Sequence, residues 1–228
     1  MTFHEQLARS TAVDRDFLLA APVIQRCLAG DVTGEVYVAF LTQAYHHVRH
    51  TVPLLMAVGA RLPERHRWLQ PAVLHYLEEE AGHDEWILND IAQAGGDRAA
   101  AAASEPAIAT EAMIAYAYDT VTRRNPLGFF GMVHVLEGTS VALALAAADR
   151  IQQTLGLPTR AFTYLRSHGE LDKEHVNDLA AILARLTEAE DREAVIRCAR
   201  GIYWLYGQVF RGLDTAVAAV PEPQRRIA

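Results

Sequence analysis

Apolar residues recur every three to four positions through almost the whole chain, which is the spacing of one face of an α-helix. Glycine and proline positions interrupt this pattern and mark helix ends. The interruptions delimit about seven predicted helices: residues 12–28, 35–61, 71–93, 107–122 and 127–155, a sixth that follows Pro158 and reaches residue 186, and a seventh at 190–219. No segment alternates in the manner of a β-strand. We therefore predict an all-α fold, a helical bundle forming a single domain over residues 1–228.

One face of the sixth predicted helix is apolar except at three neighbouring positions. His168, Asp172 and His175 lie at i, i+4 and i+7, which places them on one stripe of a helix. The stripe continues in both directions with apolar residues, so the three polar side chains should face the core. Burying them is costly unless something pairs with them. Imidazole and carboxylate are common metal ligands, so the triad predicts a metal site.

The third predicted helix carries a second candidate pair. Glu80 and His83 lie at i, i+3 on a stripe with apolar residues, an arrangement that holds paired metals in helical bundles. Glu79, at i, i+4 from His83, is the alternative ligand. Glu78 lies off this face and is expected in solvent. Taken alone the motif is weak, because glutamate and histidine are common on helix surfaces.

Two further helices each offer one candidate. Glu137 lies in 127–155 among apolar positions, so a dedicated partner is expected for its carboxylate. His134 shares that face and is a candidate to support a ligand. His47, in 35–61, lies beside the apolar line of its helix. The other histidines are expected elsewhere: His46 and His50 on the opposite side of their helix, and His4, His66 and His75 at the surface.

Each candidate has a structural alternative, because a single buried histidine is more often hydrogen-bonded in the core than bound to a metal. The structural alternative is weakest for His168, Asp172 and His175, because all three buried side chains would need hydrogen-bond partners on one apolar stripe. Nitrogen and oxygen ligands together suit iron or manganese better than structural zinc. The strong candidates are enough for two metals: Glu80, His83, Glu137, His168, Asp172 and His175.

Composition excludes some functions. The net charge of −7 lacks the basic excess typical of nucleic-acid binding, so no nucleic-acid partner is expected. Cys27 and Cys198 are isolated, which implies neither a disulfide framework nor a CxxC metal site. The N-terminus has no secretion signal, and we expect a cytoplasmic protein. The longest apolar run, 141–148, is short against the roughly 20 residues that span a bilayer, so no membrane partner is expected.

At this point the chain resembles the heme-oxygenase-like diiron oxidases and oxygenases. Residues 45–55 are also similar to bacterial members described as iron-containing redox enzymes, and the resemblance covers about residues 10–215. The fold of that family is shared with heme oxygenases, thiaminase II and pyrroloquinoline-quinone synthase. The resemblance rests on the order of three motifs: Glu80-x-x-His83, the lone Glu137, and His168-x-x-x-Asp172-x-x-His175.

The resemblance implies two ferrous ions, one held by Glu80, His83, Glu137 and His168 and the other by Asp172 and His175, with Glu137 as the bridge. Many relatives supply a further carboxylate to the second iron from an early helix. Residues 35–61 have no glutamate in their middle, and His47 is the candidate substitute. We therefore expect the second iron to be held more weakly.

The implied function is that of an O2-dependent non-heme diiron oxidase or oxygenase acting on a small organic substrate. Relatives act on amines, amino acids and fatty acids, and an external electron donor is possible in this family. A homodimer is expected, because long bundle helices often leave an apolar face for a second copy.

The alternative function is that of a metal-free enzyme of the same fold, such as a thiaminase-II-like pyrimidine hydrolase. That chemistry needs an activated cysteine, and neither Cys27 nor Cys198 has a convincing partner in the sequence pattern. A heme-binding protein would need an axial histidine near the N-terminus, where His4 is the candidate.

Overall fold

The computed structural model describes residues 1–218, except for the side chains of 170–174 and 215–218, and it contains helices and no strand within that range. The all-α prediction is confirmed. Three short 3₁₀ turns lie at Glu64–Leu69, Pro126–Gly128 and Thr159–Ala161. The helices are α1 (Phe3–Ser10), α2 (Ala12–Leu19), α3 (Pro22–Ala29), α4 (Gly34–Val48), α5 (Thr51–Arg61), α6 (Gln70–Glu80), α7 (His83–Gln93), α8 (Arg98–Ala103), α9 (Ile108–Arg123), α10 (Phe129–Leu155), α11 (Thr163–Ala184) and α12 (Ala189–Ala218).

The predicted number of helices is wrong, because α1 and α8 were not predicted and three predicted helices are each divided in two. Pro22 begins α3, and Ala21 before it is extended, as a residue preceding proline tends to be. The ring of Pro53 would clash with the carbonyl of Arg49 in a continuous helix, and α4 ends there. The third division falls at Gly82, whose φ of 90° is left-handed.

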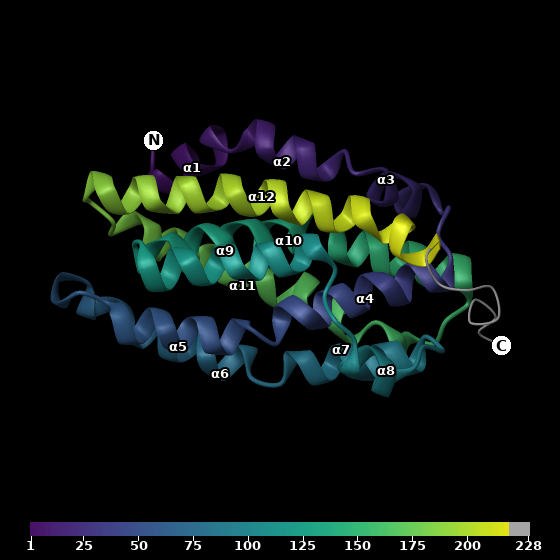
Figure 1. Cartoon of the computed structure of the whole chain (residues 1–228). Helices are drawn as coiled ribbons and strands as arrows, with labels where there is room; N and C mark the ends of the chain where they lie inside the picture. Colours follow the sequence, from purple (N-terminus) through teal and green to yellow (C-terminus); the bar gives the residue numbers. More distant parts are fainter. Residues whose placement is uncertain (219–228) are drawn as a thin grey trace.

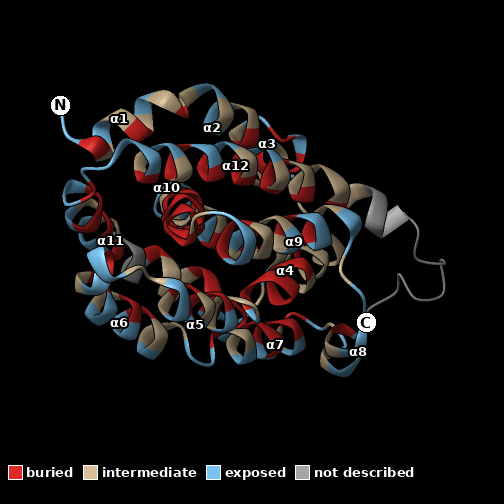
Figure 2. Ribbon diagram, turned by 60° about the vertical axis from the view of Figure 1, so that its left-hand side comes forward, coloured by how far each residue is buried: buried red, intermediate tan, exposed pale blue. Residues whose placement is uncertain are grey.

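Helix α10 forms the centre of the bundle. It contacts α3, α9, α11 and α12, and Figure 2 shows it end-on with buried residues around its circumference. The N-terminal helices α2 and α3 lie along α12 on one side, as Figure 1 shows. The pairs α5–α6 and α4–α7 close the other side. The helices that carry the functional candidates, α6, α7, α10 and α11, therefore belong to one helical assembly.

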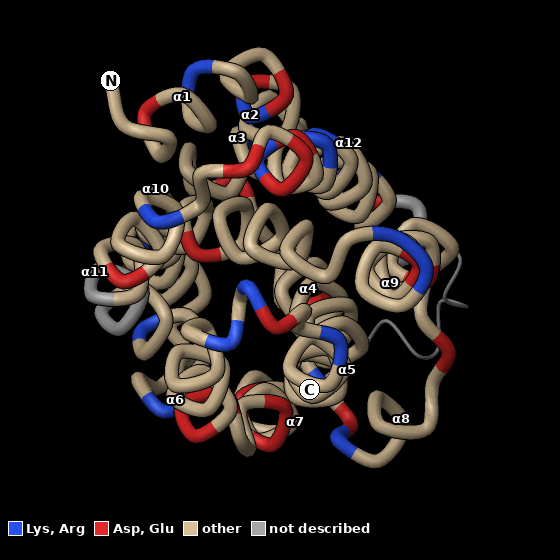
Figure 3. The backbone as a smooth tube through the Cα atoms, turned by 90° about the vertical axis from the view of Figure 1, so that its left-hand side faces the viewer, with Lys and Arg blue, Asp and Glu red and all other residues tan. Residues whose placement is uncertain are grey.

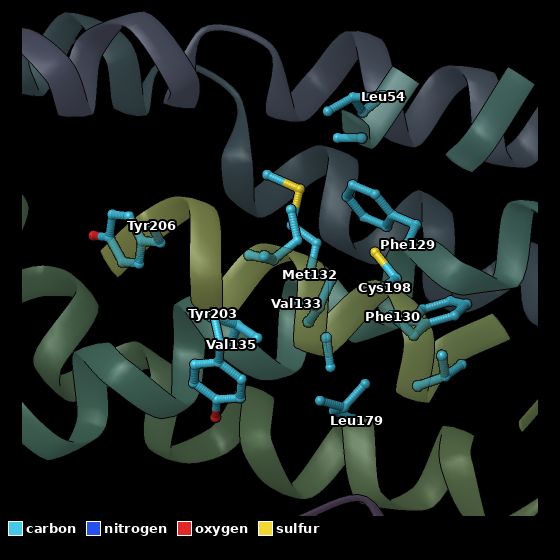
Figure 4. Packing of buried hydrophobic residues seen from close by; sticks show 14 of the residues in the cluster. Leu54, Phe129, Phe130, Met132, Val133, Val135, Leu179, Cys198, Tyr203 and Tyr206 are labelled. Atoms are coloured by element: carbon cyan, nitrogen blue, oxygen red, sulfur yellow. The ribbon is translucent and has the colours of Figure 1, made fainter. Parts of the chain in front are cut away.

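Close backbone contact joins α10 to α12. A Cβ atom added at Gly131 would lie 2.8 Å from the backbone nitrogen of Ala199, and nearer still to the carbonyl oxygen of Val195. Only glycine allows the two helices to approach this closely. Figure 4 shows the apolar cluster around this contact, in which Phe130 of α10 and Cys198 of α12 are buried.

The segment Pro126–Leu155 is long and apolar enough to cross a membrane by length and composition, with a mean hydropathy of 1.5 over its best window. In this structure 56% of that window is buried inside the protein, as for the core helix of a bundle. The sequence analysis considered only the run 141–148, which is shorter than the apolar segment that the structure contains.

Figure 3 shows acidic and basic positions interspersed along the helices.

Candidate metal centre

The Glu80-x-x-His83 motif lies across a helix break instead of within one helix. Glu80 is the last residue of α6, Ala81 is extended, Gly82 is left-handed, and His83 begins α7. The break turns the chain so that both side chains still converge: Glu80 Oε2 lies 3.2 Å from His83 Nδ1. His83 is 2% exposed, so this pair belongs to the interior and the alternative of a solvated helix face is wrong.

Helix α11 is fixed against α7 and α10 by two contacts. The carboxylate of Asp90, in α7, accepts a hydrogen bond of 2.8 Å from the backbone N–H of Tyr164 in the first turn of α11. Asp90 is fully buried, and an acid is favoured at a helix N-terminus. On the side facing α10, a Cβ at Gly169 would lie 2.6 Å from Leu145 Cγ. These contacts place His168 directly beside the α6–α7 break.

Glu80, His83 and His168 form the group best arranged to hold an ion. One potential ligand atom from each of these residues lies within 4.8 Å of the others, and the rings of His83 and His168 are 4.7 Å apart. His168 Nδ1 donates to the carbonyl of Tyr164 at 2.9 Å. That hydrogen bond leaves the lone pair on Nε2, the tautomer a metal ligand needs. These three residues fit a metal ion.

A second group of ligand-type residues lies beside the first. His175 Nε2 is 2.9 Å from Glu79 Oε2, and His175 Nδ1 is 3.6 Å from Glu137 Oε1. The ring of Tyr76 lies 5.6 Å from the His175 ring. Burial, together with the nearby Glu137 carboxylate, raises the pKa of Tyr76, so its hydroxyl stays protonated. Glu79 is thus a candidate for this second group, while Glu80 belongs to the first.

Two sequence candidates are not assigned to these groups. His47 is 2% exposed and lines the cavity beside the metal residues, but it does not belong to the group whose atoms lie within 4.8 Å. The side chain of Asp172 lies outside the described residues. Their roles as ligands stay predictions.

The protonation states of Glu80 and His47 follow from their burial and from the histidines near them. Burial works to raise the pKa of Glu80, but the hydrogen bond with His83 and the nearby His168 outweigh it, so the pKa is lowered. Glu80 is therefore a carboxylate at neutral pH. Burial, with a smaller effect from His168, lowers the pKa of His47 to about 3. A neutral imidazole can coordinate a metal or form hydrogen bonds.

Some expectations about the other polar residues were wrong. His66 was expected at the surface, yet it is buried and its Nε2 lies 2.7 Å from Asp191 Oδ2, linking the 3₁₀ turn Glu64–Leu69 to α12. The sequence contains no local signal for this pair, because its members are 125 positions apart. His46 faces away from the site as predicted, but it is buried against Ser104 at 2.9 Å. Glu78 is exposed, as predicted.

A cavity of about 160 Å³ extends from the metal residues into the bundle. Its polar end includes His47, Tyr76, Glu80, Glu137 and His168. Four of the predicted metal residues, His47, Glu80, Glu137 and His168, therefore border an internal space, which is the arrangement of a site that acts on a bound molecule.

Solved structures share this fold at low sequence identity. A domain of unknown function with a heme oxygenase-like fold from Shewanella denitrificans OS217 superposes with a TM-score of 0.84 at 24% identity, covering 96% of this chain and 94% of that one. A TenA homologue from P. horikoshii OT3 gives 0.77 at 10% identity, covering 93% and 98%. Heme oxygenase-1 from the cyanobacterium Synechocystis sp. PCC6803, in complex with heme, gives 0.72 at 13% identity, covering 96% and 95%. The predicted heme-oxygenase-like fold is confirmed.

A sequence comparison with curated proteins finds no match. The family model described as iron-containing redox enzyme matches residues 38–207. The match spans α4 to α12 and includes every residue proposed as a ligand. The chain therefore belongs to the iron-containing redox enzyme family, within the heme-oxygenase-like fold.

Proposed function

We propose that the chain is an O2-dependent non-heme diiron oxidase or oxygenase acting on a small organic substrate. The observation that carries the proposal is the convergence of Glu80, His83 and His168 beside a cavity that Glu80 and His168 line. Membership of an iron-containing family supports iron as the metal. Mixed nitrogen and oxygen ligation is also typical of non-heme iron sites.

In this proposal the first iron is held by Glu80, His83 and His168. The second would be held by His175 and Asp172, and Glu137, whose Oε1 lies 3.6 Å from His175 Nδ1, would supply a further carboxylate. Glu79 is the additional carboxylate for the second iron, because it already contacts His175 at 2.9 Å. When bound, a pair of ferrous ions supplies the electrons that reduce O2.

The protein's own residues prepare the site for that chemistry. The backbone carbonyl of Tyr164 accepts a hydrogen bond from Nδ1–H of His168, which leaves the Nε2 lone pair free to bind the ion. The buried surroundings exclude bulk water, which strengthens the attraction between the carboxylates and a cation. Tyr76 keeps its proton beside Glu137.

The alternative of a metal-free hydrolase with a cysteine nucleophile is less well supported. Cys198 is 1% exposed, and burial raises the pKa of its thiol to about 12. Cys27 lines the cavity at its apolar end, and burial raises its pKa as well. A reactive cysteine needs the opposite shift, toward the thiolate. Neither thiol is activated by its surroundings.

Three consecutive glutamates allow a matched test. Protein freed of metal is titrated anaerobically with ferrous ion, and O2 consumption is followed after mixing with air. We expect about one to two irons per chain. Glu80→Gln should weaken binding of the first iron by at least about tenfold, whereas Glu78→Gln, at an exposed position of the same helix, should bind iron like the unmodified chain. Absence of iron binding, or equal effects of both variants, would contradict the proposal.

A further inference from the structure

The cavity is strongly asymmetric in its chemistry. Its ligand-type residues are His47, Glu80, Glu137 and His168, whereas most of the remaining lining is apolar and comes from α3, α4, α5, α10, α11 and α12. Along α10 the lining continues from Glu137 to Ala147 and Ile151, which is roughly 20 Å at the rise of an α-helix. The space is thus elongated along α10, with ligand-type residues in one part of its lining and mostly hydrocarbon side chains from there to Ile151.

His47 is a polar side chain of this cavity whose buried atoms lack a hydrogen-bond partner in the described part of the chain, as does the hydroxyl of Ser140. Neither of its ring nitrogens has a hydrogen-bond partner among the described residues, although the side chain is almost fully buried. Its ring lies 5.8 Å from that of Tyr206. A buried imidazole without a partner costs free energy that a bound polar group would recover. His47 is also placed outside the closest group of metal-ligand atoms.

The charge of the lining limits the ligand further. None of the described residues that line the cavity is lysine or arginine. In the metal-free protein, a charged end group buried there would have no cationic side chain to pair with, which is costly. An end group that only donates or accepts hydrogen bonds has no such cost.

From these three observations we infer that the site takes an aliphatic chain carrying one small, uncharged polar end group. The polar end hydrogen-bonds to His47 next to the metal residues, and the hydrocarbon chain extends along α10 past Ala147. This assignment rests on the proposed function for its chemistry, but the binding step is independent of iron. It places the carbons nearest the polar end beside the metal centre.

Binding of straight-chain alcohols to metal-free protein, measured by calorimetry, tests the shape of the site. Decanol should bind much more tightly than butanol, with a gain of up to about fourfold for each added methylene. Ala147→Phe fills the cavity and should weaken decanol binding at least tenfold while sparing butanol. The matched control is Ala146→Phe, at the neighbouring exposed position of α10, which should bind both alcohols as the unmodified chain does. Equal effects of the two substitutions would overturn the inference.

Two substitutions at His47 test the polar end. His47→Phe should weaken decanol binding about tenfold, and His47→Gln, which retains a donor and an acceptor, should restore most of it. Both variants should keep the helical circular dichroism spectrum and the iron bound by Glu80, His83 and His168. If His47→Phe loses iron as His168→Ala does, His47 is a ligand and the assignment of the polar end is wrong.

The two proposals fail separately. Decanol binding without iron binding would contradict the diiron function and leave the aliphatic site standing. Iron binding with no dependence of affinity on chain length would support the diiron function and contradict the aliphatic site.

Discussion

At the scale of single residues, burial of histidine makes stability depend on pH. His134, in α10, is 9% exposed and its ring lies between those of His4 and Tyr203. Burial, with a smaller effect from His4, lowers its pKa from 6.5 to about 4. The unfolded chain therefore takes up a proton on His134 below about pH 6.5, and the folded chain only near pH 4. Acid in this window favours unfolding.

We predict that the free energy of unfolding falls as the pH is lowered from 6.5 to 4, with about 3 kcal/mol of the loss due to His134. Urea unfolding of metal-free protein across this range measures it. His134→Phe should flatten the dependence without abolishing it, because the pKa of His47 is lowered in the same direction. His75→Phe, at an exposed position, is the control. An unchanged slope in His134→Phe would refute the assignment.

The adjacent residues Glu79 and Glu80 show what residue-level analysis of the sequence lacked. Periodicity assumes that a helix continues, and on a continuous helix the two carboxylates compete for His83. Because α6 ends at Glu80, Glu80 contacts His83 and Glu79 contacts His175. The choice between them disappears once the helix break is known. Gly82 was visible in the sequence, but periodicity alone does not show that it adopts a left-handed conformation and ends the helix.

At the scale of helices, the contact between α10 and α12 depends on one glycine. A side chain at Gly131 would meet backbone atoms of Val195 and Ala199, which cannot rotate away as a flexible side chain can. We predict that Gly131→Ala destabilises the protein by about 1–3 kcal/mol, the usual cost of overpacking. Chemical unfolding of the variant measures the loss directly.

The same helix provides the control for this prediction. A Cβ at Gly138 meets no atom of the described residues within 4 Å. Gly138→Ala should therefore stabilise α10 by up to about 1 kcal/mol, the ordinary gain of alanine over glycine inside a helix. If both substitutions change stability in the same direction, close approach of α12 is not what requires glycine at position 131.

Helix positions were easier to predict than helix continuity. The ends of α9, α10 and α12 fall within two residues of the predicted ends, because strong apolar periodicity and flanking proline or glycine agree there. The breaks at Pro22, Pro53 and Gly82 were not placed, since a proline or glycine inside a long periodic segment is compatible with either a kink or a full interruption. Packing of the two halves against different neighbours decides between them.

At the scale of the whole molecule, periodicity predicted the fold class but not the pairs of distant residues that connect the helices. The bond between Asp90 and Tyr164 joins residues 74 positions apart, and no local pattern signals it. The motif order led to the correct family through a resemblance to known sequences, which is information beyond this chain's physics. The single domain, homodimer and cytoplasmic location expected from the sequence stay predictions.

The proposed first metal site joins three separate helices, so iron binding should act on the stability of the whole molecule. Glu80 ends α6, His83 begins α7 and His168 lies in α11. An ion bound only by the folded chain adds about 2.7 kcal/mol at a hundred times its dissociation constant. For a protein of this size that raises the unfolding midpoint by roughly 5–10 °C. Anaerobic thermal unfolding with ferrous ion measures the shift, with magnesium as the control, since magnesium prefers all-oxygen ligands. His168→Ala should lose the shift while keeping the helical spectrum. An equal shift in that variant would mean that the stabilising ion binds elsewhere, and the three helices would then be held together by packing alone.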